Sequence, residues 1–306
     1  MKEKKLISVI IYLYNNENSI LDFLSRIVQI TDSIFEQFEI IIVNDFSSDS
    51  SVQIIKSAPF LENHQVTIIQ MSFHQGLELS MNAGLDLSSG DFVYEFDSIL
   101  IDYNENLIGQ SYNKIIEGYD VVAVSPIESV NFTSKLFYKT YNYFTKSNYK
   151  LRTDRFRILS RRAINRSFSI SVNIPYRKAM YVNSGLKITT IEYNKTNHTK
   201  IINEKSYLRS KTAIDALIIY TNLAYKISIS IAITLLLVTL SVTIYTVIIY
   251  FGKDKPIEGW TTTMLLISFG FSGFFLLSTI IIKYLSLILE LVFKKKSYIQ
   301  EKIEKM

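Results

Sequence analysis

Three polar side chains stand directly after apolar runs in the first hundred residues. Asn15, Asp45 and Asp97 each follow a stretch rich in β-branched and other apolar residues. Such stretches are typical of buried parallel strands. Because open α/β sheets bind ligands beyond the carboxyl ends of their strands, these three side chains are predicted to lie at one binding edge.

The elements that must position these side chains alternate between strand and helix. Strands are expected at residues 6–13, 38–43, 66–71, 91–96 and 119–124, and helices at residues 20–30, 50–57, 77–87 and 107–117. This alternation predicts an α/β fold with a doubly wound, mostly parallel sheet that has helices on both faces.

Charge is divided unevenly along the 306-residue chain, whose net charge is +5. Residues 1–130 carry 6 Lys or Arg against 19 Asp or Glu, whereas residues 135–166 carry 10 against 1. An acidic half followed by a basic half indicates a separate partner for each. Since the basic half also contains long apolar segments, anionic membrane lipid is the expected partner rather than nucleic acid.

Composition excludes several classes of protein. The absence of cysteine excludes a disulfide framework, a Cys-ligated zinc site and thiol catalysis. The three histidines, His64, His74 and His198, do not pair at metal-ligand spacing, which argues against a zinc hydrolase. With 48% hydrophobic and 20% charged residues, wholesale disorder is excluded as well.

Two long segments without charge, residues 227–251 and 259–282, predict membrane spans. Each is longer than the roughly 20 residues that cross about 30 Å of hydrocarbon. The short linker between them predicts a hairpin with both ends on one side. Because lysines are more frequent at those ends than at the tip, the positive-inside bias predicts a multi-pass protein of the cell membrane, with both termini and the N-terminal domain in the cytoplasm.

The remaining boundaries follow from these segments. Residues 1–203 are expected to form the globular domain, residues 204–226 a juxtamembrane amphipathic helix, and residues 283–306 a basic cytoplasmic tail. Within the domain, residues 135–147 carry aromatic side chains at positions i, i+4 and i+7. These side chains, Phe137, Tyr141 and Phe144, predict an amphipathic interface helix lying at the bilayer surface.

Six short motifs occur in an order typical of one family. They are I-S-V-I-I-Y-L-Y-N-N-E, I-I-I-V-N-D-F-S-S-D-S, N-A-G-L-D-L-S-S-G-D, F-T-S-K-L-F-Y-K, F-R-I-L-S-R-R and G-W-T-T-T-M. The first three resemble the nucleotide-sugar half of family 2 glycosyltransferases. The others resemble its polyisoprenyl-phosphate branch, which includes dolichyl-phosphate mannose synthases and bacterial enzymes with two C-terminal spans. The resemblance implies a GT-A-type domain that moves a sugar, with inversion, from a nucleotide diphosphate to polyprenyl (undecaprenyl) phosphate.

The resemblance assigns five residues to the nucleotide sugar. Tyr14, Asn15 and Glu17 lie in the family's Tyr-Asn-Glu turn, and Asn44 and Asp45 match its Val-Asp-Asp turn, which reads the nucleobase. An Asx turn or a helix cap would explain Asp45 equally well. A composition rich in Ile, Asn and Lys is bacterial in character and favours a UDP-sugar as donor.

The family's metal motif is degenerate in this sequence. In the family, carboxylates hold Mg²⁺ or Mn²⁺, which neutralises the leaving diphosphate. Asp97 aligns with the first carboxylate of the motif Asp-Ala-Asp-Leu-Gln-Asp-Pro and Asp102 with the last, while Ile99 and Ile101 replace an Asp and a Gln. Asp97 is the expected catalytic and metal-binding residue. Glu95 shares its side of the strand, and it is either a displaced metal ligand, as Asp102 could also be, or the partner of a nearby cation.

Basic residues are expected to hold the acceptor phosphate. The resemblance puts Arg157 at the family's Phe-Arg position, where the arginine binds phosphate, and therefore makes it a candidate catalytic residue. The full expected set is Lys135, Arg155, Arg157, Arg161 and Arg162. For the last two, a solvated basic face resting on anionic headgroups is an equal alternative. The resemblance also implies a homo-oligomer that serves cell-wall or surface-glycan synthesis.

Two functions remain open from the sequence. The first is a transferase that makes a polyprenyl-phosphate sugar, and the retained Asp45, Asp97 and Arg157 favour it. The second is a catalytically impaired protein that binds lipid or nucleotide, or that acts as a scaffold for an active glycosyltransferase. Ile99 and Ile101 favour the second function. We prefer the first.

Overall fold

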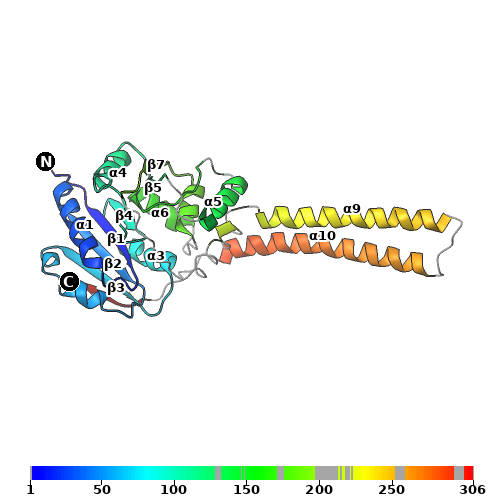
Figure 1. The fold of residues 1–306 in the computed structure, drawn as a ribbon, viewed down its shortest axis with the longest axis horizontal. Helices are drawn as coiled ribbons and strands as arrows, with labels where there is room; N and C mark the ends of the chain where they lie inside the picture. Colours follow the sequence, from blue (N-terminus) through cyan, green and yellow to red (C-terminus); the bar gives the residue numbers. More distant parts are fainter. Residues whose placement is uncertain are drawn as a thin grey trace. The chain divides into compact units, whose positions relative to one another are not determined.

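The structure is a computed structural model of the chain. It describes residues 2–127, 132–170 except 146 and 148, 176–196, 223–251, 259–292 and 300–305, with residues 213, 216, 217 and 221 between them. The chain divides into two compact units (Figure 1). Residues 1–216 and 293–306 form a globular unit, and residues 217–292 form a helical unit.

In the described residues, the globular unit contains an eight-stranded sheet in the order β7-β5-β6-β4-β1-β2-β3-β8. The strands are β1 (Ile7–Leu13), β2 (Phe38–Asn44), β3 (Gln65–Met71), β4 (Phe92–Phe96), β5 (Val121–Pro126), β6 (Phe156–Ser160), β7 (Ile188–Tyr193) and β8 (Gln300–Lys305). Strands β1 to β4 are mutually parallel, and β5 is parallel to β7. Only β6 and β8 run antiparallel to their neighbours in the described sheet, which confirms the predicted mostly parallel fold.

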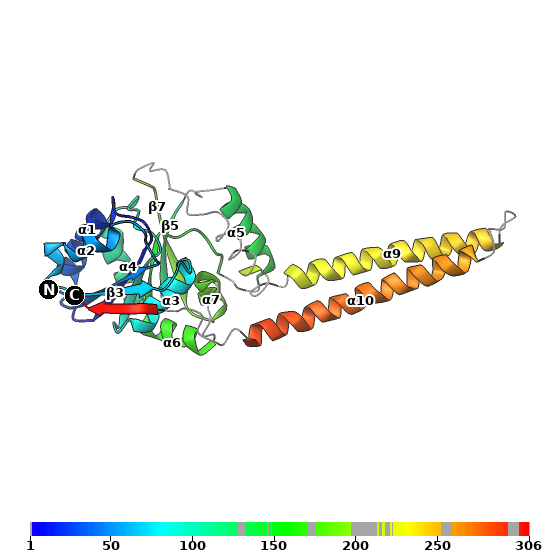
Figure 2. The same cartoon turned by 90° about the horizontal axis from the view of Figure 1, so that it is seen from below.

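Helices alternate with the strands close to the predicted positions. They are α1 (Ile20–Ile34), α2 (Ser51–Lys56), α3 (Leu77–Leu87), α4 (Asn106–Ile116), α5 (Phe132–Phe144), α6 (Arg161–Ile170) and α7 (Arg177–Asn183), with a 3₁₀ turn at Pro59–Leu61. Both faces of the sheet are covered, as Figure 2 shows. On one face α1 and α4 pack on Val9 and Ile11 of β1. On the other, α3 approaches β1 so closely that a Cβ on Gly84 would lie 2.5 Å from Cγ2 of Ile10.

The aromatic face of α5 differs from the prediction. Tyr141 is fully buried in the protein, and its hydroxyl accepts a hydrogen bond of 2.7 Å from Asn183 of α7. Phe137 packs its ring against the ring of Tyr141. Among the described side chains of α5, Leu136 and Tyr143 are instead the exposed large apolar ones. The predicted membrane-facing residues thus belong in part to the core, because α7 packs beneath α5 and requires an apolar cover.

The helical unit consists of α9 (Leu223–Phe251) and α10 (Trp260–Val292), which lie side by side. Lys226–Phe251 and Trp260–Leu285 have mean hydropathies of 2.4 and 2.2 and are long and apolar enough to cross a membrane. Few of their described side chains are buried, unlike those of a core helix, so the two helices indicate a membrane protein. The predicted juxtamembrane helix at residues 204–226 lies largely outside the described residues.

After α10 the chain returns to the sheet. Residues 283–292 continue α10, and β8 then pairs antiparallel with β3, with Ile69 opposite Ile303. The basic cytoplasmic tail predicted for residues 283–306 thus contains the end of α10 and strand β8, and its basic cytoplasmic character stays a prediction. The physical reason for the pairing of β8 is that β3 would otherwise be an edge strand with unpaired backbone donors and acceptors, which β8 satisfies.

Candidate active site at the carboxyl edge of the sheet

The turns after β1 and β2 are joined by hydrogen bonds at the carboxyl edge of the sheet. Oδ1 of Asn15 accepts from the backbone N–H of Ser48 at 2.8 Å. Oε2 of Glu17 accepts from the backbone N–H of Ser50 at 3.0 Å, and Asp49 accepts from the N–H of Glu17 at 2.9 Å. The φ of 50° at Asn15 is one that asparagine tolerates better than most residues. The predicted residues of these turns are thus brought together.

Asp45 lies at the centre of this edge and is fully buried. Its carboxylate accepts hydrogen bonds from the hydroxyl of Tyr12 at 2.9 Å and from the backbone N–H groups of Gln75 and Gly76 at 2.7 and 2.8 Å. Nδ1 of His74 lies 2.9 Å from the same carboxylate. Asp45 therefore ties the turn after β3 to the turn after β2, and both of its oxygens are in use.

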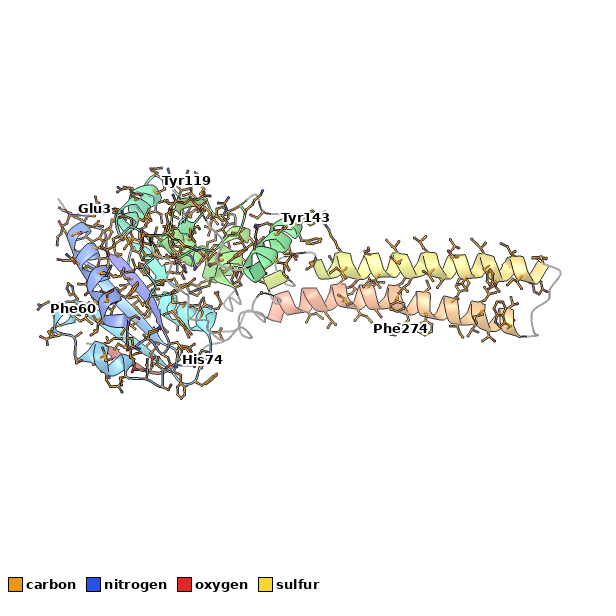
Figure 3. The ribbon with its side chains drawn as sticks, in the orientation of Figure 1. Glu3, Phe60, His74, Tyr119, Tyr143 and Phe274 are labelled. Carbon is orange, nitrogen blue, oxygen red and sulfur yellow. The ribbon has the colours of Figure 1, made fainter. Side chains whose placement is uncertain are left out.

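Aromatic rings lie near Asp45 at this edge, where Figure 3 labels His74. The rings of Tyr14 and His74 are stacked with their centroids 4.2 Å apart. Phe46 is 54% exposed, so the turn presents an apolar ring to solvent. Its φ of 61° is a left-handed backbone conformation, which costs free energy for a residue other than glycine. Asn44 is buried, donates to Oε1 of Gln70 at 2.6 Å and accepts from the backbone N–H of Ser47 at 3.2 Å. Stacked and exposed rings are suited to the planar face of a nucleobase.

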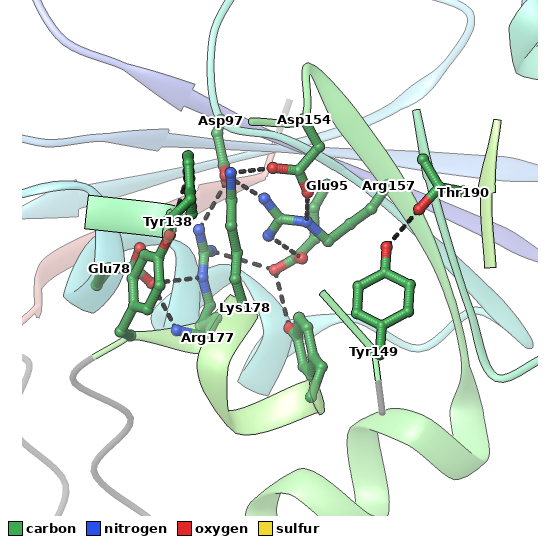
Figure 4. A network of polar contacts seen from close by, with 12 residues as sticks. Glu78, Glu95, Asp97, Tyr138, Tyr149, Asp154, Arg157, Arg177, Lys178 and Thr190 are labelled. Carbon is green, nitrogen blue, oxygen red and sulfur yellow. Dashed lines mark hydrogen bonds and ion pairs between the residues drawn. The ribbon is translucent and has the colours of Figure 1, made fainter. Parts of the chain in front are cut away.

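A second polar group surrounds Asp97, the residue after β4. It is a network of ion pairs that we call the ion-pair cluster (Figure 4). Its members are Glu78, Glu95, Asp97, Asp154, Arg157, Arg177 and Lys178. Four carboxylates thus face three cations in one small region.

Two arginines bridge the same two carboxylates in the ion-pair cluster. Arg157 donates through Nη1 to Glu95 at 2.8 Å and through Nη2 to Asp97. Arg177 donates through Nη1 to Glu95 at 3.1 Å and through Nη2 to Asp97 at 2.6 Å. Each guanidinium group therefore contacts one oxygen of each carboxylate, and all four carboxylate oxygens accept from an arginine.

The remaining members extend the ion-pair cluster on two sides. Glu78 of α3 accepts from Nε and from the backbone N–H of Arg177, both at 3.0 Å. Asp154 accepts from Nε of Arg157 at 2.9 Å and forms an ion pair with Lys178. The cluster thereby connects α3, β4, β6 and the first turn of α7.

The local fold explains why these charges meet. In the antiparallel pair of β4 and β6, Glu95 lies directly opposite Arg157. Arg177 enters from the first residue of α7, and the hydroxyl of Tyr181 donates to Glu95 at 3.3 Å. Buried charges are stable only when they are paired and hydrogen-bonded. Of the two alternatives for Glu95, pairing with a nearby cation is therefore confirmed.

Electrostatics in the ion-pair cluster favour the charged forms. Burial alone would raise the pKa of Asp97, but the charges of Arg157 and Arg177 outweigh it and hold the pKa well below its usual range. Burial would likewise lower the pKa of Arg157, but Asp97 and Glu95 raise it well above the ordinary value. Ionised Asp97 is thus part of the folded structure.

This shift predicts acid sensitivity. Because the pKa of Asp97 is lower in the folded than in the unfolded chain, its stabilising contribution is fully present above about pH 5 and is lost as the pH falls through about 4 toward the folded value. We expect the free energy of unfolding, measured by urea denaturation of the solubilised chain, to decrease between about pH 5 and pH 3. Asp97→Asn should flatten this decrease, although Asp49 and Asp120, whose pKa values are also lowered, will preserve part of it. An unchanged slope in Asp97→Asn would contradict the assignment.

The other predicted metal ligand, Asp102, lies in a separate buried group. Its carboxylate accepts from Nε of Arg155 at 2.8 Å and from the hydroxyl of Tyr193 at 2.7 Å. Burial would lower the pKa of Arg155, but the hydrogen bond and charge of Asp102 raise it above its ordinary value. Arg155, predicted to bind lipid phosphate, is thus paired inside the protein.

The residues at this edge do not fit a divalent cation. The oxygens of Asp97 and Glu95 accept from guanidinium groups, and those of Asp102 face Arg155 and Tyr193. Ile99 and Ile101 pack against the hydrophobic core. Within the described part of the chain, no group of three or more His, Cys, Asp or Glu side chains is placed to hold a metal ion.

Of the three other residues predicted to bind the lipid phosphate, one is exposed and two form hydrogen bonds within the protein. Lys135 is exposed on α5. Arg161 donates to the carbonyl oxygen of Gly90 at 2.9 Å, and Arg162 donates to Asp120 at 2.6 and 2.5 Å while its side chain stays largely exposed. Their role in phosphate binding, like that of buried Arg155 and Arg157, stays a prediction.

Sequence reasoning missed four members of the site: Glu78, Asp154, Arg177 and Lys178. One signal was available, because a glutamate at position 95 inside a buried strand requires a cation. The sequence could not identify Arg177 as that cation, since it lies 82 residues away from Glu95 along the chain.

The sheet order and its carboxyl-edge site define an α/β protein of the GT-A type. A mannosyltransferase from Pyrobaculum calidifontis, solved with GDP-mannose and Mn²⁺, has a similar fold with a TM-score of 0.52 and 12% identity, covering 70% of this chain and 64% of that chain. Glucosyl-3-phosphoglycerate synthase from Mycobacterium tuberculosis, solved with Mn²⁺, UDP-glucose and phosphoglyceric acid, gives a TM-score of 0.53 and 13% identity, covering 70% and 78%. At such identities the likeness shows the fold alone.

The sequence profile of Glycosyl transferase family 2 matches residues 8–183, which is more than half of the chain. The chain therefore belongs to glycosyltransferase family 2, and its class of enzyme is a transferase.

The chain is also similar to individual proteins, over different shares of its length. The chain is 25% identical over 282 residues to the uncharacterized glycosyltransferase YkcC of Bacillus subtilis, covering 88% of this chain and 85% of the relative. It is 27% identical over 195 residues to an uncharacterized glycosyltransferase of Synechocystis, covering 62% and 61%. It is 31% identical over 118 residues to the undecaprenyl-phosphate 4-deoxy-4-formamido-L-arabinose transferase of Aeromonas hydrophila, covering 39% of this chain and 36% of that transferase.

Proposed function

We propose that this chain is a membrane-bound, inverting glycosyltransferase that moves a sugar from a nucleotide diphosphate to a polyprenyl phosphate. The observation that carries the proposal is the convergence of the turns after β1, β2 and β3 on Asp45, at the same edge as Asp97. That edge is where open α/β sheets bind their ligands. Family membership supports the class of reaction.

The donor side is formed by the first three turns. Tyr14 and the stacked ring of His74 supply a surface for the nucleobase, and Asn15, Glu17 and Asp45 fix the turns that shape it. Asn44 contributes by holding the end of β2 to β3. A UDP-sugar is the favoured donor.

On the acceptor side, the groups that we propose are positively charged side chains of the globular unit. Lys135 is exposed on α5, and Lys178 of α7 belongs to the ion-pair cluster at the same edge as the donor turns. These groups are suited to the phosphate of a polyprenyl chain or to anionic lipid headgroups. The undecaprenyl-phosphate transferases among the relatives support this acceptor class.

The proposed sugar transfer depends little on general acid or general base catalysis. A phosphate oxygen of the acceptor attacks the anomeric carbon from the face opposite the nucleotide, and the bond from that carbon to the leaving diphosphate breaks. Because the acceptor is already an anion, no residue has to remove a proton from it. The protein must instead align the two phosphates and balance their charge.

The location follows from the helices. α9 and α10 cross the membrane as a hairpin with both outer ends on the cytoplasmic side. Pairing of β8 with β3 supports the hairpin, because it requires the chain after α10 to be on the same side as the globular unit. Assembly as a homo-oligomer and a role in surface-glycan synthesis complete the proposal.

The test is transfer by the full chain in lipid nanodiscs that contain undecaprenyl phosphate, with a panel of radiolabelled UDP- and GDP-sugars. We expect one donor to give a labelled lipid product. Tyr14→Ala should raise the KM for that donor about tenfold through the loss of stacking, whereas Arg152→Ala, in an exposed ion pair, should not change it. Donor binding without a lipid product would support the non-catalytic alternative, and neither binding nor product would overturn the proposal.

A further inference from the structure

We infer that Arg157 and Arg177 occupy the carboxylates that would hold a divalent cation in other GT-A folds, so that this chain binds its donor without metal. The inference rests on the proposed function, because it concerns the donor of that reaction. The solved neighbours that contain Mn²⁺ share the fold but little sequence.

The first argument is the occupation of the carboxylates. A metal site at the end of β4 would need free oxygens on Asp97 and Glu95. The two arginines bind all four of these oxygens. Three of the four N–O distances are 2.6, 2.8 and 3.1 Å. A cation would have to displace two buried guanidinium groups from Glu95 and Asp97 and leave Arg157 only Asp154 and Arg177 only Glu78 as partners, which is costly.

The second argument is the balance of charge. Arg157 and Arg177 bring two positive charges to Glu95 and Asp97 and also pair with Asp154 and Glu78, so that, together with Lys178, three of the cluster's four carboxylate charges are balanced without a metal. Each arginine also bridges the carboxylates of Glu95 and Asp97, as a shared metal ion would. The two hydrophobic replacements in the metal motif, Ile99 and Ile101, are compatible with this arrangement because they leave no unfilled ligand position.

The third argument is the path by which a phosphate could approach. The ion-pair cluster reaches solvent at Asp97, Glu78 and Lys178, whose side chains are 11%, 13% and 14% exposed. Lys178 is the cation among these three. It is therefore the group that would meet the diphosphate, while the buried arginines act as positioning residues that fix the surrounding carboxylates.

Isothermal titration of the full, detergent-solubilised chain with UDP and with GDP, each in EDTA and in Mn²⁺, tests the inference. We expect the Kd for the bound nucleotide to agree within about threefold between the two conditions. Binding at least tenfold tighter in Mn²⁺ would overturn the inference and leave the proposed function standing. Absence of binding in both conditions would overturn the proposed function, and the inference with it.

A readout independent of nucleotide uses Mn²⁺ itself. The electron paramagnetic resonance signal of free Mn²⁺ should not decrease when the wild-type chain is added. In the double variant Arg177→Gln with Ile99→Asp, one oxygen each of Glu95 and Asp97 loses its arginine, and position 99 regains a carboxylate. This variant should therefore bind Mn²⁺ and reduce the signal. Arg152→Gln with Ile99→Asp is the matched control and should not. Binding by the wild-type chain, or no gain in the first double variant, would overturn the inference.

Lys178 has a test of its own. Lys178→Met should weaken nucleotide binding about tenfold in EDTA, and Lys178→Arg should restore it, because a second cation can replace the ammonium group. Equal weakening in both variants would instead indicate a structural role and overturn the assignment of Lys178.

Discussion

Arg177→Met is expected to lower the free energy of unfolding by about 3–5 kcal/mol, the typical cost of removing one partner of a buried ion pair. Arg177 is fully buried and binds Glu78, Glu95 and Asp97. Its removal leaves Glu78 without its cation and leaves Glu95 and Asp97 to Arg157 alone. Urea denaturation of the solubilised chain, followed by circular dichroism, measures the change.

Two comparisons make this result specific. Arg152→Met removes an arginine from an exposed pair with Glu192 and should cost at most about 1 kcal/mol. Combining Arg177→Met with Glu95→Gln restores the net charge of the ion-pair cluster and should recover part of the loss. Equal effects of Arg177→Met and Arg152→Met would contradict the view that the cluster stabilises this edge.

Asp45→Asn is expected to lower the free energy of unfolding by about 1–3 kcal/mol. The carboxylate of Asp45 accepts from the backbone N–H groups of Gln75 and Gly76 and from Tyr12. An asparagine would turn an amide N–H toward one of these donors and leave a buried donor unsatisfied. The turn that carries His74 should loosen as a result, and nucleotide affinity should fall about tenfold or more.

Thermal unfolding and titration with nucleotide measure these two effects together. Asp32→Asn is the control for loss of a negative charge, because Asp32 pairs with Lys2 at the surface, and it should change stability by no more than about 0.5 kcal/mol. Unchanged stability in Asp45→Asn would show that the three turns are held together by other contacts.

The strands and helices of the first half were predictable because each is a separate apolar run with a polar turn behind it. Leu77–Leu87 was predicted with its observed bounds, and the strand that ends at Phe96 places Asp97 directly after it. Parallel order then brings Asn15 and Asp45 to one edge without any knowledge of side-chain contacts. The assignment of five residues to the nucleotide sugar came instead from the resemblance of the turn motifs to those of the family.

The ion-pair cluster was not predictable to the same degree. It depends on β6 entering the sheet antiparallel between β4 and β5, which puts Arg157 opposite Glu95. No pattern within Phe156–Ser160 determines that position, because a short buried strand fits either direction. The contribution of Arg177 depends on the packing of α7, and the sequence therefore indicated only that Glu95 needed some partner.

The pairing of β8 with β3 has a consequence for how the protein is made. The ribosome synthesises β3 early and β8 only after both apolar helices. Until then the outer edge of β3 is a template on which strands of other chains can pair. Completion of the sheet therefore has to wait until both apolar helices have been synthesised, and a chain that ends before β8 would keep an open, aggregation-prone edge.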